Sequence, residues 1–258
     1  MPALSFFRQL AARNGLNLLG VVDARRFDRS QPKELRTAAT LPGCGTVLAV
    51  GTAGRSFWAE FQQQGVAAAL DARAAEVLVD ASVDAFVDQV RRLKGRVRRV
   101  GPEDGRLNFG HLAEAAGFGI VSPVSGMVLH PEFGPWMKVR AAVLLEGRPF
   151  GAVRDASLSA RFKPCCSCDR PCVSACPSGA LDGLGGNDRA QCADHRAVGG
   201  CASLCSARGA CPVGADHADR PELPLHAHSV DLATLQRRYG RGWWRFVPRS
   251  LRGAQATA

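Results

Sequence analysis

Nine of the ten cysteines in this 258-residue chain lie between Cys165 and Cys211. Over residues 164–215 sustained apolar runs vanish, and Cys, Pro, Gly and Arg dominate. Such a stretch has too little apolar surface to build a core unaided. In a reducing compartment, crowded cysteines indicate metal ligands or redox groups rather than disulfides. We therefore expect an inorganic group to hold this part of the chain together.

The cysteine spacing is close to that of two-cluster ferredoxin domains. These domains use C-x2-C-x2-C-x3-C-P, in which the fourth cysteine serves the other cluster. The upstream run is Cys165-x2-Cys168-x3-Cys172-x3-Cys176-Pro177, one residue longer in its second gap. The downstream run is Cys192 followed by Cys201-x3-Cys205-x5-Cys211-Pro212. Because the Cys-Pro ending recurs, we predict two 4Fe-4S clusters.

The pseudo-twofold arrangement of such domains divides the eight ligands into two sets. Set A is Cys165, Cys168, Cys172 and Cys211, and set B is Cys176, Cys192, Cys201 and Cys205. Cys166 is an alternative to Cys165 in set A, and Cys44 is expected to be a buried core thiol. Two four-cysteine zinc sites are the alternative reading, although zinc ribbons have no reason to repeat Cys-Pro.

Charge and apolar runs limit the possible partners. The formal net charge is +10, but two thiolate-bound clusters would lower it to about +6, which is only moderately basic. Nucleic-acid binding is therefore not expected. The N-terminus lacks the features of a secretory signal, and the sequence contains no run of eighteen uncharged apolar residues. We expect a cytoplasmic protein without a membrane span.

The sequence before the cysteines mixes helical and strand patterns without strict alternation. Helices are expected over 3–14, 67–93 with a possible break near Asp80, and 107–117; strands are expected over 16–23, 46–52, 96–100, 127–130 and 137–147. After Pro177, the residues SGAL are expected to begin a helix. This order favours an α+β layered sandwich over a doubly wound nucleotide fold.

We expect three parts along the chain. They are an α+β main domain over 1–155, a double-cluster domain over 156–218 and an Arg/Trp-rich segment over 219–258. In the last part, the run LATLQRRYGRGWWRFVPRSLRG is expected either to dock a redox partner or nucleic acid or to pack its tryptophans back onto the main domain. We favour the packing interpretation because exposed Trp is uncommon.

The stretch HLAEAAGFGIVSPVSGMVLHPEFGPWMKVRAAVLLEGRPFG (111–151), with the cysteines that follow it, resembles epoxyqueuosine reductases and corrinoid-dependent reductive dehalogenases. LNLLGVVDA and LPGCGTVLAVG are similar to the N-terminal part of the former. The resemblance implies a nitroreductase-like main domain that binds a cobalamin, reduced through two 4Fe-4S clusters in a ferredoxin-like domain. The sequence ends without the helical repeats of the tRNA-modifying enzymes, so action on tRNA is not expected.

The predicted activity is that of a cobalamin-linked iron-sulfur reductase. Single electrons would pass from a ferredoxin or flavodoxin-like donor to a bound corrinoid, for reduction of a small-molecule substrate or of the corrinoid itself. The alternative is a double-cluster electron-transfer or maturation protein that binds no cobalamin.

Two acidic residues are the candidates for a proton donor. The resemblance implies an acidic residue about fourteen positions before Gly117, which here is Glu103, beside Asp104. The flanking residues GPEDGR depart from the family pattern. A loop carboxylate next to a cofactor can act as a general acid if burial raises its pKa, and a solvated turn is the alternative.

The corner HPEFGPW is the candidate cofactor contact. There a glycine would let a large ring approach the backbone, and a tryptophan would pack on the ring. The residues predicted to contact the corrinoid are His130, Pro131, Gly134 and Trp136. A tight hairpin without a ligand is the alternative interpretation.

Overall fold

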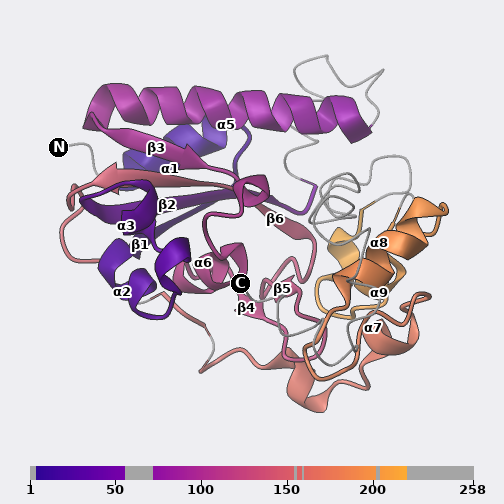
Figure 1. Cartoon of the computed structure of the whole chain (residues 1–258). Coiled ribbons are helices and arrows are strands. Elements are labelled where there is room, and N and C mark those ends of the chain that lie inside the picture. The colour runs from indigo at the N-terminus through magenta and orange to yellow at the C-terminus, as the bar shows by residue number, and fades with distance from the viewer. Residues whose placement is uncertain (1–3, 56–71, 154–155, 159, 202–203, 220–258) are drawn as a thin grey trace.

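The computed structural model describes residues 4–55, 72–153, 156–158, 160–201 and 204–219 (Figure 1). The helices are α1 (Leu4–Arg13), α2 (Ala24–Arg29), α3 (Thr37–Thr40), α5 (Ala72–Lys94), α6 (Phe109–Ala115), α7 (Pro171–Ser174), α8 (Arg189–Ala197) and α9 (Ser206–Gly209). The strands are β1 (Leu18–Asp23), β2 (Cys44–Ala53), β3 (Val97–Val100), β4 (Ile120–Val121), β5 (Val128–Leu129) and β6 (Met137–Glu146). Short 3-10 turns are η1 (Lys33–Leu35), η3 (Pro102–Asp104), η4 (Pro164–Ser167) and η5 (Ala215–His217). The Arg/Trp-rich run beyond Asp231 lies outside the described residues.

A four-stranded antiparallel sheet, in the order β1-β2-β6-β3, forms the centre of the molecule. Every residue of β2 is buried, because helices cover both faces of the sheet. Alternate residues divide between the faces: Val47 and Ala49 belong to one apolar cluster, and Leu48 and Val50 to the other. The expected mixture of helices and strands is confirmed.

Helices α1 and α5 cover one face of the sheet (Figure 1). Phe7 of α1 and Phe86 and Val90 of α5 are fully buried there, as the helical spacing of apolar residues predicts. The helix expected over 67–93 has no break at Asp80 where one was thought possible, since α5 continues through this residue. Asp80 lies on the exposed side of the helix, where its carboxylate accepts a hydrogen bond from Arg99 at 3.0 Å.

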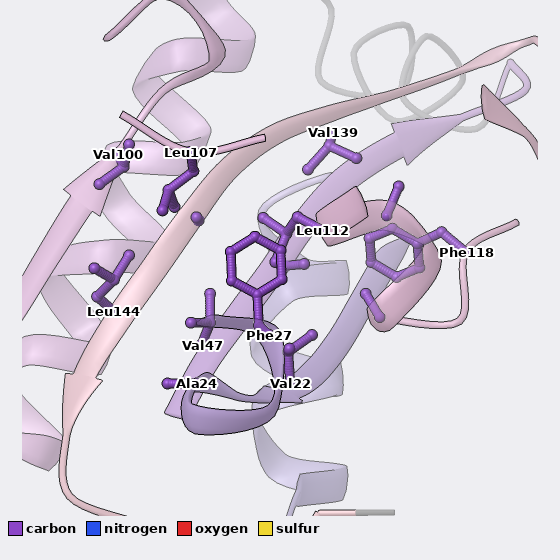
Figure 2. Packing of buried hydrophobic residues seen from close by; sticks show 14 of the residues in the cluster. Val22, Ala24, Phe27, Val47, Val100, Leu107, Leu112, Phe118, Val139 and Leu144 are labelled. Atoms are coloured by element: carbon purple, nitrogen blue, oxygen red, sulfur yellow. The ribbon is translucent and has the colours of Figure 1, made fainter. Parts of the chain in front are cut away.

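Helices α2 and α6 cover the opposite face. Figure 2 shows Phe27 of α2 and Leu112 of α6 among the buried side chains that meet Val47 and Leu144 of the sheet. The predicted core position of Cys44 is confirmed, because this thiol is 8% exposed and burial raises its pKa. Among the described residues, no helix is long and apolar enough to cross a membrane.

The strand expected over 127–130 is confirmed as β5, which pairs with β4 in a separate two-stranded sheet. One local prediction needs correction. The residues SGAL after Pro177 do not begin a helix: Leu181 forms an isolated bridge with Asn187, and α8 starts only after Asp188. Asp188 caps that helix by accepting a hydrogen bond from Gln191 N–H at 3.0 Å.

Candidate metal centre

The β4–β5 hairpin supplies the apolar core of the cysteine-rich segment. In the turn of this hairpin, the Ser122 hydroxyl accepts hydrogen bonds from the N–H groups of Val124 and Ser125. The turn places Val124 in a buried cluster with Leu181 and Ala207. The cysteine-rich segment therefore depends on side chains that lie some forty residues upstream of it.

The four cysteines of set A line one cavity, whose wall is largely apolar. Val124, Met127 and Leu129, all from the hairpin or its turn, line the same cavity. The Cys165 sulfur lies 3.3 Å from the Ser122 hydroxyl, whereas Cys166 is exposed and is absent from the lining of this cavity. The geometry therefore favours Cys165 over Cys166 as the member of set A.

Burial and mutual repulsion govern the thiols of set A. Burial raises the pKa of Cys172, and the neighbouring thiols of Cys165 and Cys168 raise it further. Burial likewise raises the pKa of Cys211, and the other three members of set A add to the effect. Ionising all four thiols together requires a cationic group among them, which a metal or cluster would supply when bound.

The members of set B also lie close to one another. Burial raises the pKa of Cys192 to about 11, and the nearby thiol of Cys205 raises it, as do Cys176 and Cys201. The Arg196 guanidinium opposes this shift. Cys201 has a φ of 50°, which is uncommon for a residue with a side chain, and its sulfur lies 3.7 Å from the Ser206 hydroxyl.

Both Cys-Pro pairs direct backbone N–H groups at the cysteine sulfur. At Cys176 burial raises the pKa, but hydrogen bonds from the Ser178 hydroxyl and from the N–H groups of Leu181, Ala180 and Ser178 outweigh it. The pKa of Cys176 is therefore below its ordinary value. At Cys211 the N–H of Val213, also two residues on, donates to the sulfur. Such N–H donors stabilise thiolate ligands and tune iron-sulfur centres.

The donor set fits thiolate-ligated clusters. Two sets of four soft sulfur ligands, each with N–H donors, match the ligand chemistry of 4Fe-4S centres. Within the described part of the chain, no three His, Cys, Asp or Glu side chains are grouped closely enough to hold a single metal ion. The four thiolates around an Fe-S cube are farther apart than the ligands of one ion.

The predicted proton donors lie on an exposed turn. Glu103 and Asp104 form η3, and both are exposed. The Asp104 carboxylate accepts a hydrogen bond from Gly101 N–H at 2.7 Å and so caps the turn. The burial that a general acid requires is not provided by the protein around these two residues.

The corner HPEFGPW forms a tight hairpin. His130 and Gly134 exchange backbone hydrogen bonds at 2.8 and 2.9 Å, and the His130 Nδ1 accepts from the N–H groups of Glu132 and Phe133. Burial lowers the pKa of His130; Glu132 raises it and His217 lowers it. The His130 and Phe133 rings are 4.7 Å apart, and Phe133 meets His217 at 4.8 Å.

Other residues of the protein pack against the corner HPEFGPW at the positions where a corrinoid contact was predicted. Gly134 has a φ of +55°, and a Cβ there would overlap the Val213 carbonyl. Trp136 is 1% exposed, and its Nε1 has no hydrogen-bond partner among the described residues. The described residues therefore present Gly134 and Trp136 as contacts inside the protein rather than as an open surface for a corrin ring. The corner packs against the loop that follows Cys211.

A separate cavity of about 440 Å³ lies beside α2 and α6. His111, Glu114, Arg26 and Ser30 line it. Its polar side chains have partners inside the protein: His111 Nδ1 lies 3.1 Å from Gln31 Nε2, and Glu114 accepts from Val121 N–H at 2.7 Å. None of the predicted site residues lines this cavity.

No protein-family model matches the chain, and no curated protein matches it by sequence. Solved structures do match. Epoxyqueuosine reductase from Bacillus subtilis aligns with a TM-score of 0.59 and 17% identity over 94% of this chain and 77% of that one. An epoxyqueuosine reductase with a modified tRNA-Tyr stem loop gives 0.59 and 18% over the same shares.

A catabolic reductive dehalogenase in complex with 3-bromo-4-hydroxybenzoic acid aligns with a TM-score of 0.53 and 16% identity, over 84% of this chain and 32% of that one. The structural neighbours include epoxyqueuosine reductases and corrinoid reductive dehalogenases. The expected resemblance is confirmed at the level of the fold, and the neighbours are oxidoreductases by name.

Three further side chains at the cysteine sets were not foreseen. Ser122 lies in an ordinary turn sequence, and no neighbouring residue in the chain indicates that its hydroxyl contacts Cys165. Ser178 could have been predicted from the sequence, because it directly follows a Cys-Pro pair and a hydroxyl two residues after a cysteine can reach the cysteine sulfur. Arg208 lies three residues after Cys205, but its burial depends on tertiary packing.

Proposed function

We propose that the protein is an iron-sulfur oxidoreductase whose two cysteine sets each hold one 4Fe-4S cluster. The single observation that carries the proposal is the lining of one apolar cavity by all four members of set A. When bound, the two clusters supply single-electron transfer between an external donor and an acceptor. A ferredoxin or flavodoxin-like protein is the proposed donor.

The residues of the chain hold and shield these groups. Val124 and Leu129 keep water from the sulfurs of set A, and a dry surrounding favours the less charged state of a cluster. The Ser122 hydroxyl and the N–H of Val213 orient the sulfurs of Cys165 and Cys211. The hairpin thus joins set A to the central sheet, which makes set A the proposed exit toward the main domain.

The proposed acceptor is a corrinoid bound by the main domain. Support comes from the structural neighbours, one of which is described as a B12-dependent dehalogenase. Glu103 and Asp104 remain the proposed proton donors, provided that a bound ligand covers their turn. His130 remains a proposed contact, because it is half-buried and its Nδ1 is already fixed by two N–H groups.

A second candidate is an electron-transfer or maturation protein that binds no cobalamin. The observation that favours it is the burial of Trp136 together with the packing of Gly134 on Val213. In this case the main domain docks a partner protein, and set A passes electrons to that partner.

A cobalamin titration distinguishes the two candidates. Anaerobically reconstituted protein, with about eight irons per chain, is mixed with cobalamin and observed for the base-off spectral shift. A saturating shift, with cobalt reduction slowed by Cys176→Ala but binding retained, supports the corrinoid reductase. Full iron loading with no shift supports the second candidate. A colourless zinc protein without sulfide contradicts both.

A further inference from the structure

Arg208 is a buried cation at the edge of set B. It lies in α9, three residues after Cys205, and is 7% exposed. Its Nε and Nη1 have no hydrogen-bond partner in the part of the chain that the structure describes. Removing a guanidinium from water carries a large desolvation penalty, which negative or hydrogen-bond-accepting groups around it must offset. Such a group needs a negative partner.

Two groups face the Arg208 guanidinium. Burial lowers its pKa, and the charges of Cys205 and Asp219 raise it. Asp219 is itself 8% exposed. Cys205 supplies a permanent negative charge only as a thiolate, which is the form that binds metals. Arg208 therefore gains this negative partner when set B holds a cluster and Cys205 is a thiolate.

We propose that the free N–H groups of Arg208 donate to the sulfurs of the cluster held by set B and raise its reduction potential above that of the cluster held by set A. This inference rests on the proposed function. Reduction adds one negative charge to a cluster, and a buried cation stabilises that charge more strongly than an exposed one.

Among the residues that the structure describes, no buried arginine lines the cavity of set A. Arg170 lines the cavity of set A, but it is exposed, and its guanidinium Nη1 donates to the Gly183 carbonyl at 3.4 Å. Water and salt screen such a charge. Because both sets receive backbone N–H donors, the buried cation is the difference that sets the order of reduction. One electron from the external donor, which is oxidised by one electron, goes first to set B, and no bond forms or breaks.

The test is a potentiometric titration of reconstituted protein with dithionite, followed by electron paramagnetic resonance. Arg208→Met removes the charge at similar volume, and Arg161→Met is the matched control because Arg161 is exposed on the same segment. We expect Arg208→Met to shift one of the two midpoint potentials to a more negative value and Arg161→Met to shift neither. The shift should persist in a Cys172→Ala background, which leaves only set B complete.

Asp219→Asn should shift the midpoint potential in the direction opposite to Arg208→Met. It also keeps the inference testable if Arg208→Met fails to bind iron and sulfide. Removing that carboxylate leaves the cation less neutralised, so the potential of set B should shift to a more positive value. Loaded Arg208→Met that shifts neither midpoint potential overturns the inference, and so does a loaded Asp219→Asn without the positive shift when Arg208→Met fails to load. Wild-type protein without iron and sulfide would instead contradict the proposed function.

Discussion

Set A and set B each consist of four cysteines, but the protein surrounds the two sets differently. Hydrophobic residues of the β4–β5 hairpin line the cavity of set A, and the loop after Cys211 packs against the corner HPEFGPW. Set B lies with α8 and α9, near Arg196 and Arg208. The comparison teaches that set A is coupled to the central sheet by apolar packing, whereas set B is distinguished by buried positive charge.

Removal of iron and sulfide should unfold the segment that contains both cysteine sets and so remove the difference between their surroundings. The apolar cluster shared by both sets contains few large side chains, so it cannot hold residues 160–219 once the inorganic groups are gone. Hydrogen exchange should show loss of protection across this segment while β2 and β6 stay protected. Equal protection with and without the metal would mean that the segment folds without the metal.

Single cysteine substitutions should separate the two sets. Cys172→Ala and Cys176→Ala should each leave about four of about eight irons, because each removes one ligand from one set. Cys166→Ala and Cys44→Ala are the controls and should keep the full content, since Cys166 is exposed and Cys44 is in the core. Iron and sulfide analysis decides; a loss in Cys166→Ala would move the ligand from Cys165 to Cys166.

Gly134→Ala should weaken the link between the main domain and set A. A Cβ at 134 would overlap the Val213 carbonyl, while Gly147 has a similar φ of +67° with open space around it. Gly147→Ala therefore carries the backbone strain without the overlap. We expect Gly134→Ala to lower the free energy of unfolding by about 1–3 kcal/mol more than the control. Urea titration of both loaded variants measures the difference.

The sequence predicts some features well for identifiable reasons. The periodic residues Phe86 and Val90 indicated α5, and the spacing around Cys172 grouped the set A cysteines that the structure gathers at one cavity. Local patterns suffice there. The pairing of β5 with β4 and the burial of Arg208 depend on contacts between distant parts of the chain, so no local pattern reports them. The possible break near Asp80 does not occur, because Asp80 lies on the exposed side of a continuous helix.

A smaller effect is expected from the pH dependence of His130. Burial lowers the pKa of this histidine in the folded protein below its ordinary value of 6.5. At a pH below 6.5 the unfolded chain therefore binds a proton at this residue more readily than the folded chain does. Stability should therefore fall as the pH drops below about 6.5, because protonation of Nδ1 breaks its bonds to the N–H groups of Glu132 and Phe133. His130→Gln should show a flatter pH profile of unfolding. An unchanged profile would contradict the assignment.

The most direct test of two thiolate-bound cubes is iron and acid-labile sulfide analysis of anaerobically prepared wild-type protein, with Mössbauer spectroscopy on the same sample. We predict about eight irons and about eight sulfides per chain, in two sites of four. Zinc without sulfide, or about four irons in a single site, would contradict the account.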